Sequence, residues 1–217
     1  MINRRSLLEQ HRLTEREQKN FQLLELIRQR GPLTRTELSQ GSGFNIVTVS
    51  NYIGEFIKRG LVSERGFDIS TGGRKPILVE LNPKVGYAIG IDTGPISISG
   101  TNTIMVITDL RGQIVHRVAK VKAPGGMDQT MEGLSGLIRE LFASSPVDTK
   151  RIRGIGIGLP GIVDERAETA RDTSQHGIRV NYPVVRDQLE TEFHLPVLMG
   201  NDAMLAGYGE LRIGLDR

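Results

Sequence analysis

Two of the aspartates that follow apolar, strand-like runs in this 217-residue chain are placed where a carboxylate can meet a ligand. The first is Asp92, in the stretch "AIGIDTGPISISGTNTIMVITDL" from Ala88 to Leu110. Glycine permits a positive φ, and successive backbone amides in a glycine-containing turn can converge on an anion. The stretch is therefore phosphate-loop-like, with four candidate residues: Asp92, Gly94, Gly100 and Thr101.

The second aspartate is Asp202, which closes the strand-like run "LPVLMGND". A carboxylate at a strand end can accept a hydroxyl proton or simply a hydrogen bond. Polar loops at the carboxyl ends of strands form the expected ligand crevice of an α/β sheet. In an alternative interpretation, the Asn201–Asp202 pair caps the helix that follows, and the two roles can coexist.

A different kind of chemistry is offered by residues 45–60, "NIVTVSNYIGEFIKRG", which predict a helix. Asn45 is the expected N-cap and Gly60 the expected stop. Three apolar side chains are spaced i, i+4 and i+7 and should face inward: Val49, Ile53 and Phe56. The outward face then carries Val47, Asn51 and Lys58.

Two further helices are predicted before residue 45. The segment "TEREQKNFQLLELIRQRG" predicts a helix with Leu23, Leu24 and Ile27 on one side, which Gly31–Pro32 ends. "TRTE" (34–37) is a capping box that opens a short helix through Leu38, before "QGSG" breaks the chain.

Two helices joined by a short turn, the second beginning with small polar residues, are typical of a helix-turn-helix. In that interpretation Asn51 bonds a base edge, Val47 touches a thymine methyl, and Thr48 and Ser50 reach phosphates. Asn45 joins them as a candidate DNA contact. The alternative is an αα-hairpin in any helical domain, because caps and periodicity indicate helices and not DNA.

The segment "LVSERGFDISTGGRKPILVEL" is apolar, then glycine-rich, then apolar again, which predicts a hairpin with a loose tip. A hairpin after the second helix makes a wing, whose basic residues can enter a minor groove. The candidates are Arg65, Arg74 and Lys75. An exposed turn with incidental charge is the alternative.

Charge is spread unevenly along the chain. Residues 1–75 hold 13 Lys/Arg and 8 Asp/Glu, a balance of 13 − 8 = +5, whereas residues 76–217 hold 15 and 17, a balance of −2. This distribution favours nucleic-acid contact through the first third. There is no cysteine, no metal-ligand spacing of histidines, no secretory signal and no run long enough to span a membrane. We therefore expect a cytoplasmic protein without a metal or cofactor.

After residue 86 the pattern changes to three successive strands followed by alternating helices and strands. This order predicts a mixed α/β lobe. We expect a winged helix-turn-helix domain at 1–81, a short linker at 82–86 and the α/β lobe at 87–217.

The chain resembles the ROK family of sugar-responsive repressors and sugar kinases. Three pieces carry the resemblance: "STGGRKPILVELNP", "GIGIGLPGIVD" and "LPVLMGNDAMLAGYGE". The first belongs to the repressor branch. The resemblance implies the first lobe of an actin-like ATPase (ribonuclease H-like) fold, with the second lobe and the family's cysteine-rich zinc motif absent from this sequence. Such a lobe would expose an apolar surface that invites self-association.

The resemblance also assigns roles. Asp202 occupies the position of the kinases' catalytic base, here vestigial, and Asn201 matches a sugar-contacting residue. Gly158, Pro160 and Gly161 match a loop near the sugar. Without Pro95–Ser99 the opening stretch would read "GIDTGGTNTIMVITDL", the family's usual loop. This five-residue insertion is expected to scatter the phosphate-binding amides, so that the loop does not bind a phosphate as a kinase loop would. The alternative is a harmless hairpin extension that keeps a distorted pocket.

Together these features predict a regulator, most simply a repressor of sugar-utilisation genes, and not an enzyme. Its expected partners are double-stranded operator DNA, a sugar or sugar-phosphate effector, and a second copy of the chain in a homodimer or higher oligomer. The alternatives are an ATP-dependent sugar kinase, which needs a nucleotide clamp, and a truncated regulator that no longer senses sugar.

Overall fold

The computed structural model describes residues 14–67, 77–94, 101–122, 127–164, 169–171 and 179–212. The chain divides into two compact units, Met1–Val85 and Gly86–Arg217. Among the candidate residues, Arg74, Lys75 and Gly100 lie outside the described part, as does the Pro95–Ser99 insertion.

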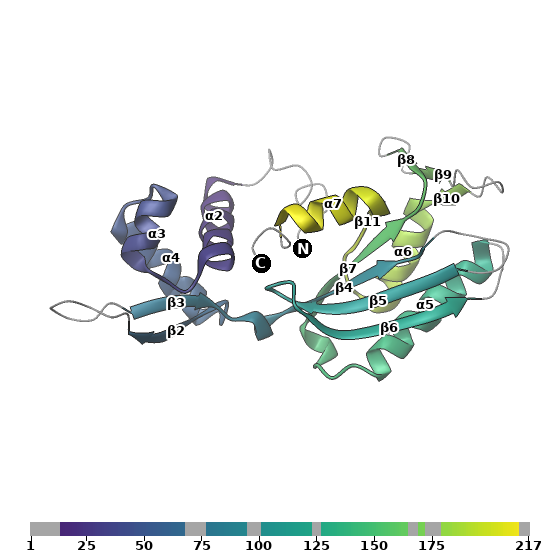
Figure 1. Cartoon of the computed structure of the whole chain (residues 1–217), viewed down its shortest axis with the longest axis horizontal. Coiled ribbons are helices and arrows are strands. Elements are labelled where there is room, and N and C mark those ends of the chain that lie inside the picture. Colours follow the sequence, from purple (N-terminus) through teal and green to yellow (C-terminus); the bar gives the residue numbers. More distant parts are fainter. Residues whose placement is uncertain are drawn as a thin grey trace. The chain divides into compact units, whose positions relative to one another are not determined.

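The described part of the first unit consists of α-helices and a small antiparallel sheet (Figure 1). In chain order its elements are α2 (Glu15–Arg30), β1 (Leu33–Thr34), α3 (Arg35–Ser42), α4 (Ile46–Lys58), β2 (Val62–Phe67), β3 (Ile77–Leu81) and a 3-10 turn (Pro83–Val85). β3 pairs with both β1 and β2. The predicted hairpin is therefore confirmed, whereas β1 was not predicted because two residues are too short for a periodic pattern.

The core of this unit comes from one side of each helix. Leu23 and Ile27 of α2 and Leu38 of α3 are buried, and Leu24 is only partly so. The predicted inward face of α4 is confirmed, since three of its side chains are completely buried: Val49, Ile53 and Phe56.

The extent of α3 differs from the prediction. The capping box is present, with the Thr34 side chain accepting from the Glu37 backbone and Glu37 accepting from the Thr34 backbone, but the helix continues past Leu38 to Ser42. Gly41 does not break it, and a β-carbon there would lie 2.9 Å from Cδ2 of Leu26, so the glycine lets α2 and α3 pack closely. The helix ends at Gly43, whose φ of 74° is unfavourable for other residues.

The second unit begins with three successive strands and continues with alternating helices and strands, as predicted. Its main elements are β4 (Tyr87–Asp92), β5 (Thr101–Asp109), β6 (Ile114–Lys122), α5 (Met127–Ala143), a 3-10 turn (Thr149–Arg151), β7 (Ile152–Leu159), α6 (Tyr182–Phe193), β11 (Val197–Asn201) and α7 (Asp202–Arg212). A small antiparallel sheet that was not predicted consists of β8 (Ile162–Asp164), β9 (Thr169–Arg171) and β10 (Arg179–Asn181).

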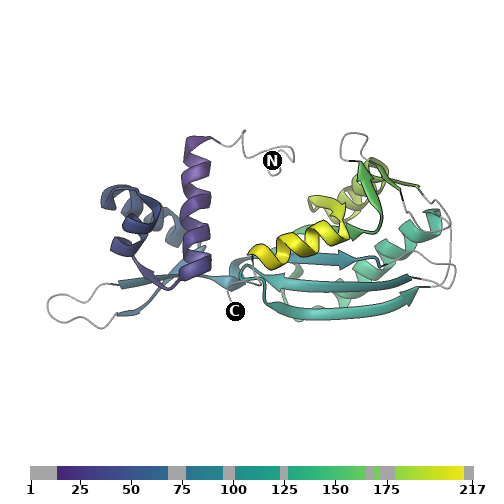
Figure 2. The same ribbon diagram turned by 45° about the horizontal axis from the view of Figure 1, so that its top comes forward.

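The main sheet of this unit has the order β11-β7-β4-β5-β6. Its strands are labelled in Figure 1, and Figure 2 shows the same ribbon turned by 45°. β4, β7 and β11 run parallel to one another, while β5 pairs antiparallel with β4 and β6. The predicted mixed sheet is thus confirmed. Alternate residues of the strands, such as Ile89, Ile91, Met105 and Ile107, form one buried cluster with Ile138 of α5 and Leu189 of α6.

Candidate functional site

The first candidate site is the outward face of α4. Burial of Val49, Ile53 and Phe56 fixes the rotation of this helix about its axis, because all three lie on one side. The opposite side carries Val47, which is 66% exposed, and Asn51 and Lys58, which are also exposed. The predicted outward residues therefore share one accessible face.

The first turn of α4 is set by its N-cap. The Thr48 N–H donates to Oδ1 of Asn45 at 2.8 Å, so the Asn45 side chain is already engaged within the helix. Thr48 and Ser50 are half-buried beside the exposed Val47. Ile46, which the sequence did not single out, is 45% exposed and extends the apolar part of this turn.

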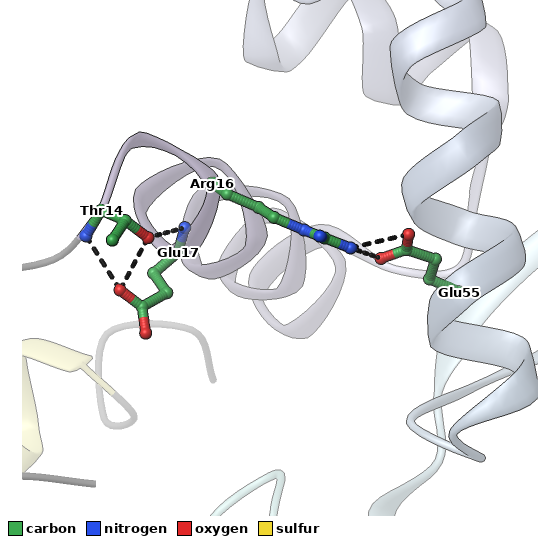
Figure 3. A network of polar contacts seen from close by, with 4 residues as sticks. All are labelled: Thr14, Arg16, Glu17 and Glu55. Carbon is green, nitrogen blue, oxygen red and sulfur yellow. Dashed lines mark hydrogen bonds and ion pairs between the residues drawn. The ribbon is translucent and has the colours of Figure 1, made fainter.

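An ion pair joins α4 to α2 within the first unit. One guanidinium nitrogen of Arg16 lies 2.8 Å from each carboxylate oxygen of Glu55 (Figure 3). The hydrogen bond with Glu55 raises the pKa of Arg16. Nearby, the Thr14 side chain lowers the pKa of Glu17 by donating a hydrogen bond to its carboxylate in a second capping box.

Two other described cations near α4 differ in their ion-pair partners. Arg65 of β2 is paired with Glu80 of β3 at 3.2 Å, although its side chain is exposed. Lys58, by contrast, has no ion pair within the part of the chain that the structure describes. A phosphate could therefore meet Lys58 directly, whereas Arg65 would first have to exchange its carboxylate partner.

The second candidate site is the carboxyl edge of the parallel strands in the second unit. Asp92 at the end of β4 is in register with Gly158 of β7, and Gly158 is in register with Gly200 of β11. The structure thus brings the predicted residues of three separate segments to one edge. Both the N–H and the hydroxyl of Thr93 donate to the Gly158 carbonyl, at 3.3 and 3.1 Å, a contact the sequence did not reveal.

Asn201 holds this edge together. Its Nδ2 donates to the carbonyl of Gly161 at 2.8 Å, and its Oδ1 accepts from the Met204 N–H at 2.9 Å. The cap interpretation is therefore confirmed for Asn201, which fixes the loop containing Pro160 and Gly161 to the start of α7. Gly161 has a φ of 95°, a conformation that favours glycine.

Two carboxylates flank this arrangement. Oδ1 of Asp92 accepts from the Gly94 N–H at 2.9 Å, and Oδ1 of Asp202 accepts from the Ala203 N–H at 2.7 Å. The half-buried Asp202 lies against Gly158, where a β-carbon would approach the Asp202 Cα to 3.4 Å. The edge thus offers oxygen acceptors of the kind that bind hydroxyl groups. Among the described residues, no group of three His, Asp or Glu side chains could hold a metal ion.

Helix α7 presents an apolar face. Four of its side chains are between 44% and 69% exposed: Met204, Leu205, Tyr208 and Leu211. These exposed side chains form an apolar surface on the described part of α7, and self-association through such a surface stays a prediction. None of the described helices is both long and apolar enough to cross a membrane.

Comparison with known proteins adds independent information. A sequence model described as "ROK family" matches residues 88–217. A putative xylose repressor of Caldicellulosiruptor sp. (strain Rt8B.4) is 34% identical over 194 residues, which cover 88% of this chain and 47% of that protein. The xylose repressor of Bacillus subtilis (strain 168) is 29% identical over 192 residues and is covered to 48%.

One relative and one solved structure with lower identity are also described as transcriptional regulators. The DNA-binding transcriptional dual regulator NagC of Escherichia coli (strain K12) is 25% identical over 178 residues, covering 82% of this chain and 42% of that protein. A crystal structure of a ROK family transcriptional regulator, a homologue of the E. coli MLC protein, matches with a TM-score of 0.67 and 20% identity, over 88% of this chain and 47% of that one. The chain spans about half the length of the curated relatives it matches.

The double role of Asn201 can be tested by thermal unfolding of the second unit. Asn201→Ala removes both the cap of α7 and the bond to Gly161, and we expect a loss of about 2 kcal/mol. Asn201→Ser keeps a capping oxygen but cannot reach Gly161, so it should lose only about half as much. Equal stability of the Ala and Ser variants would contradict the capping role.

Proposed function

Because the chain belongs to the ROK family, we propose that it is a DNA-binding transcriptional regulator that responds to a sugar. In this proposal residues 1–81 form a winged helix-turn-helix, residues 82–86 are the linker, and residues 87–217 are the first lobe of an actin-like ATPase fold. The boundary between the compact units after Val85 supports this division. These two relatives are named as xylose repressors, which favours regulation over a kinase activity.

The proposed DNA binding rests on the outward face of α4. In it, α3 and α4 are the helix-turn-helix and α4 enters a major groove. Val47 meets a thymine methyl, and Asn51 bonds a base edge. Lys58, Thr48 and Ser50 contact phosphates.

The hairpin of β2 and β3 would form the wing, with Arg65 at its described end. Asn45 would contribute its backbone near the DNA, since its side chain caps α4. One such module gives limited affinity and specificity, so we propose that two copies bind the operator as a homodimer.

Asp202, Asn201 and the loop of Gly158, Pro160 and Gly161 would bind the sugar or sugar phosphate. The contacts of Asn201 support a positioning role for this residue, which leaves Asp202 as the main acceptor for a sugar hydroxyl. The effector would act by binding more tightly to one of two arrangements that differ in DNA affinity. No catalytic step is assigned to this site.

DNA binding is tested by gel shift on the DNA that flanks the protein's own gene, in a salt series. Lys58→Ala removes one phosphate contact per copy, so the negative slope of log K against log salt should become shallower by about 0.9 per copy, or about 1.8 for the bound homodimer. Lys150→Ala, which removes an exposed lysine of the second unit, is the matched control and should leave the slope unchanged. Binding no better than nonspecific at low salt would refute the proposal.

Sugar binding is tested by thermal shift with xylose, N-acetylglucosamine and glucose. A sugar present at 100 times its Kd should stabilise the protein by about 2.7 kcal/mol. Asp202→Asn keeps the size of the side chain but removes its charge and should abolish most of the shift. Glu210→Gln, on the exposed surface of the same helix, should not. An unchanged shift in Asp202→Asn would contradict the assigned role.

A further inference from the structure

Gly54 lies inside α4, on its outward face. It follows Val47 by seven residues and Asn51 by three, and it precedes Lys58 by four, so all four positions fall on one stripe of the helix. The stripe lies opposite the buried side chains of Val49, Ile53 and Phe56. Apart from Gly54, every residue of the stripe is exposed and bears a side chain that can make contacts.

The fold itself gives no reason for a glycine at this position. Glycine is among the least favourable residues in a helix interior. Gly54 does not have a positive φ, and a β-carbon built on it would meet no atom within 4 Å. Gly41 in α3 differs, because a β-carbon there would lie 2.9 Å from Leu26. Contacts within this unit thus do not explain the missing side chain at Gly54, and Gly54, unlike Gly136 of α5, lies on the stripe that carries the proposed DNA contacts.

The dimensions of DNA indicate which part of a bound duplex would lie beside Gly54. An α-helix rises about 1.5 Å per residue, so Gly54 lies roughly 10 Å farther along the axis than Val47. A major groove is about 12 Å wide. When the first turn of α4 reaches the base edges, Gly54 consequently reaches the wall of the groove, which is made of sugars and phosphates. Lys58, one turn farther on the same stripe, supplies a positive charge for that wall.

We propose that the sugar–phosphate backbone of bound DNA packs directly against the main chain of α4 at Gly54. The missing β-carbon then sets how deeply the helix enters the groove. This inference rests on the proposed DNA-binding function and adds to it a residue that determines the fit without making a polar contact.

The test is a pair of measurements on Gly54→Ala in the full chain. Thermal unfolding reports stability, and fluorescence anisotropy reports the affinity for a labelled duplex from the DNA flanking the gene. We expect the melting temperature of the first unit to rise by about 4 °C, because alanine favours the helix. The Kd for DNA should rise about tenfold, the effect of one disturbed contact in such an interface. Gly54→Leu should weaken binding further.

Gly136→Ala is the matched control. Gly136 also lies inside a helix, α5 of the second unit, and a β-carbon there would likewise meet nothing within 4 Å. This variant should raise stability without changing the Kd. The inference is overturned if Gly54→Ala binds DNA like the wild type, if it lowers the melting temperature, or if Gly136→Ala weakens binding equally. A wild-type chain that binds no DNA would overturn the proposed function as well.

Discussion

The burial of three side chains on one side of α4 is the constraint on which the rest of the first unit depends. Val49, Ile53 and Phe56 are completely buried, and each contributes about 1.5–3 kcal/mol by leaving water. A rotation of the helix that exposed them would cost several times that amount. The helix is therefore held in one orientation, and the residues that remain accessible follow from it. The core thus determines which residues form the outward stripe, namely Val47, Asn51, Gly54 and Lys58. The proposed DNA contact through this stripe therefore depends on the core as well.

The second unit obtains its candidate site from a comparable backbone constraint. Parallel pairing of β4, β7 and β11 makes the ends of three strands coincide, although Asp92, Gly158 and Asn201 are far apart in the sequence. Asn201 then joins the loop at Gly161 to the first turn of α7. In the first unit the buried side of α4 leaves its opposite face accessible, and in the second unit strand pairing brings polar groups to one edge of the sheet. In the proposed function, the helix face meets DNA and the sheet edge meets a sugar.

The sequence was sufficient for features that depend on local patterns. The inward face of α4 follows from a spacing of i, i+4 and i+7, and the capping box of α3 from Thr34 and Glu37. Prediction from the sequence failed where packing or pairing between elements determines the structure. The predicted end of α3 at Leu38 was wrong because Gly41 fits against Leu26 without breaking the helix. Likewise β1 was missed because pairing with β3, and not its own two residues, makes it a strand. The contact of Thr93 with Gly158 spans 65 residues and has no local signal.

The central claim, that the outward face of α4 contacts DNA, is tested most directly by site-specific cross-linking. The chain contains no cysteine, so Val47→Cys introduces a single thiol to which an azidophenacyl group can be attached. Lys150→Cys, at an exposed position of the second unit, provides the control. The account predicts that irradiation with the duplex from the gene's flanking DNA cross-links the protein from position 47 and not from position 150. Equal cross-linking from both positions, or none from position 47 under conditions in which the protein binds, would contradict it.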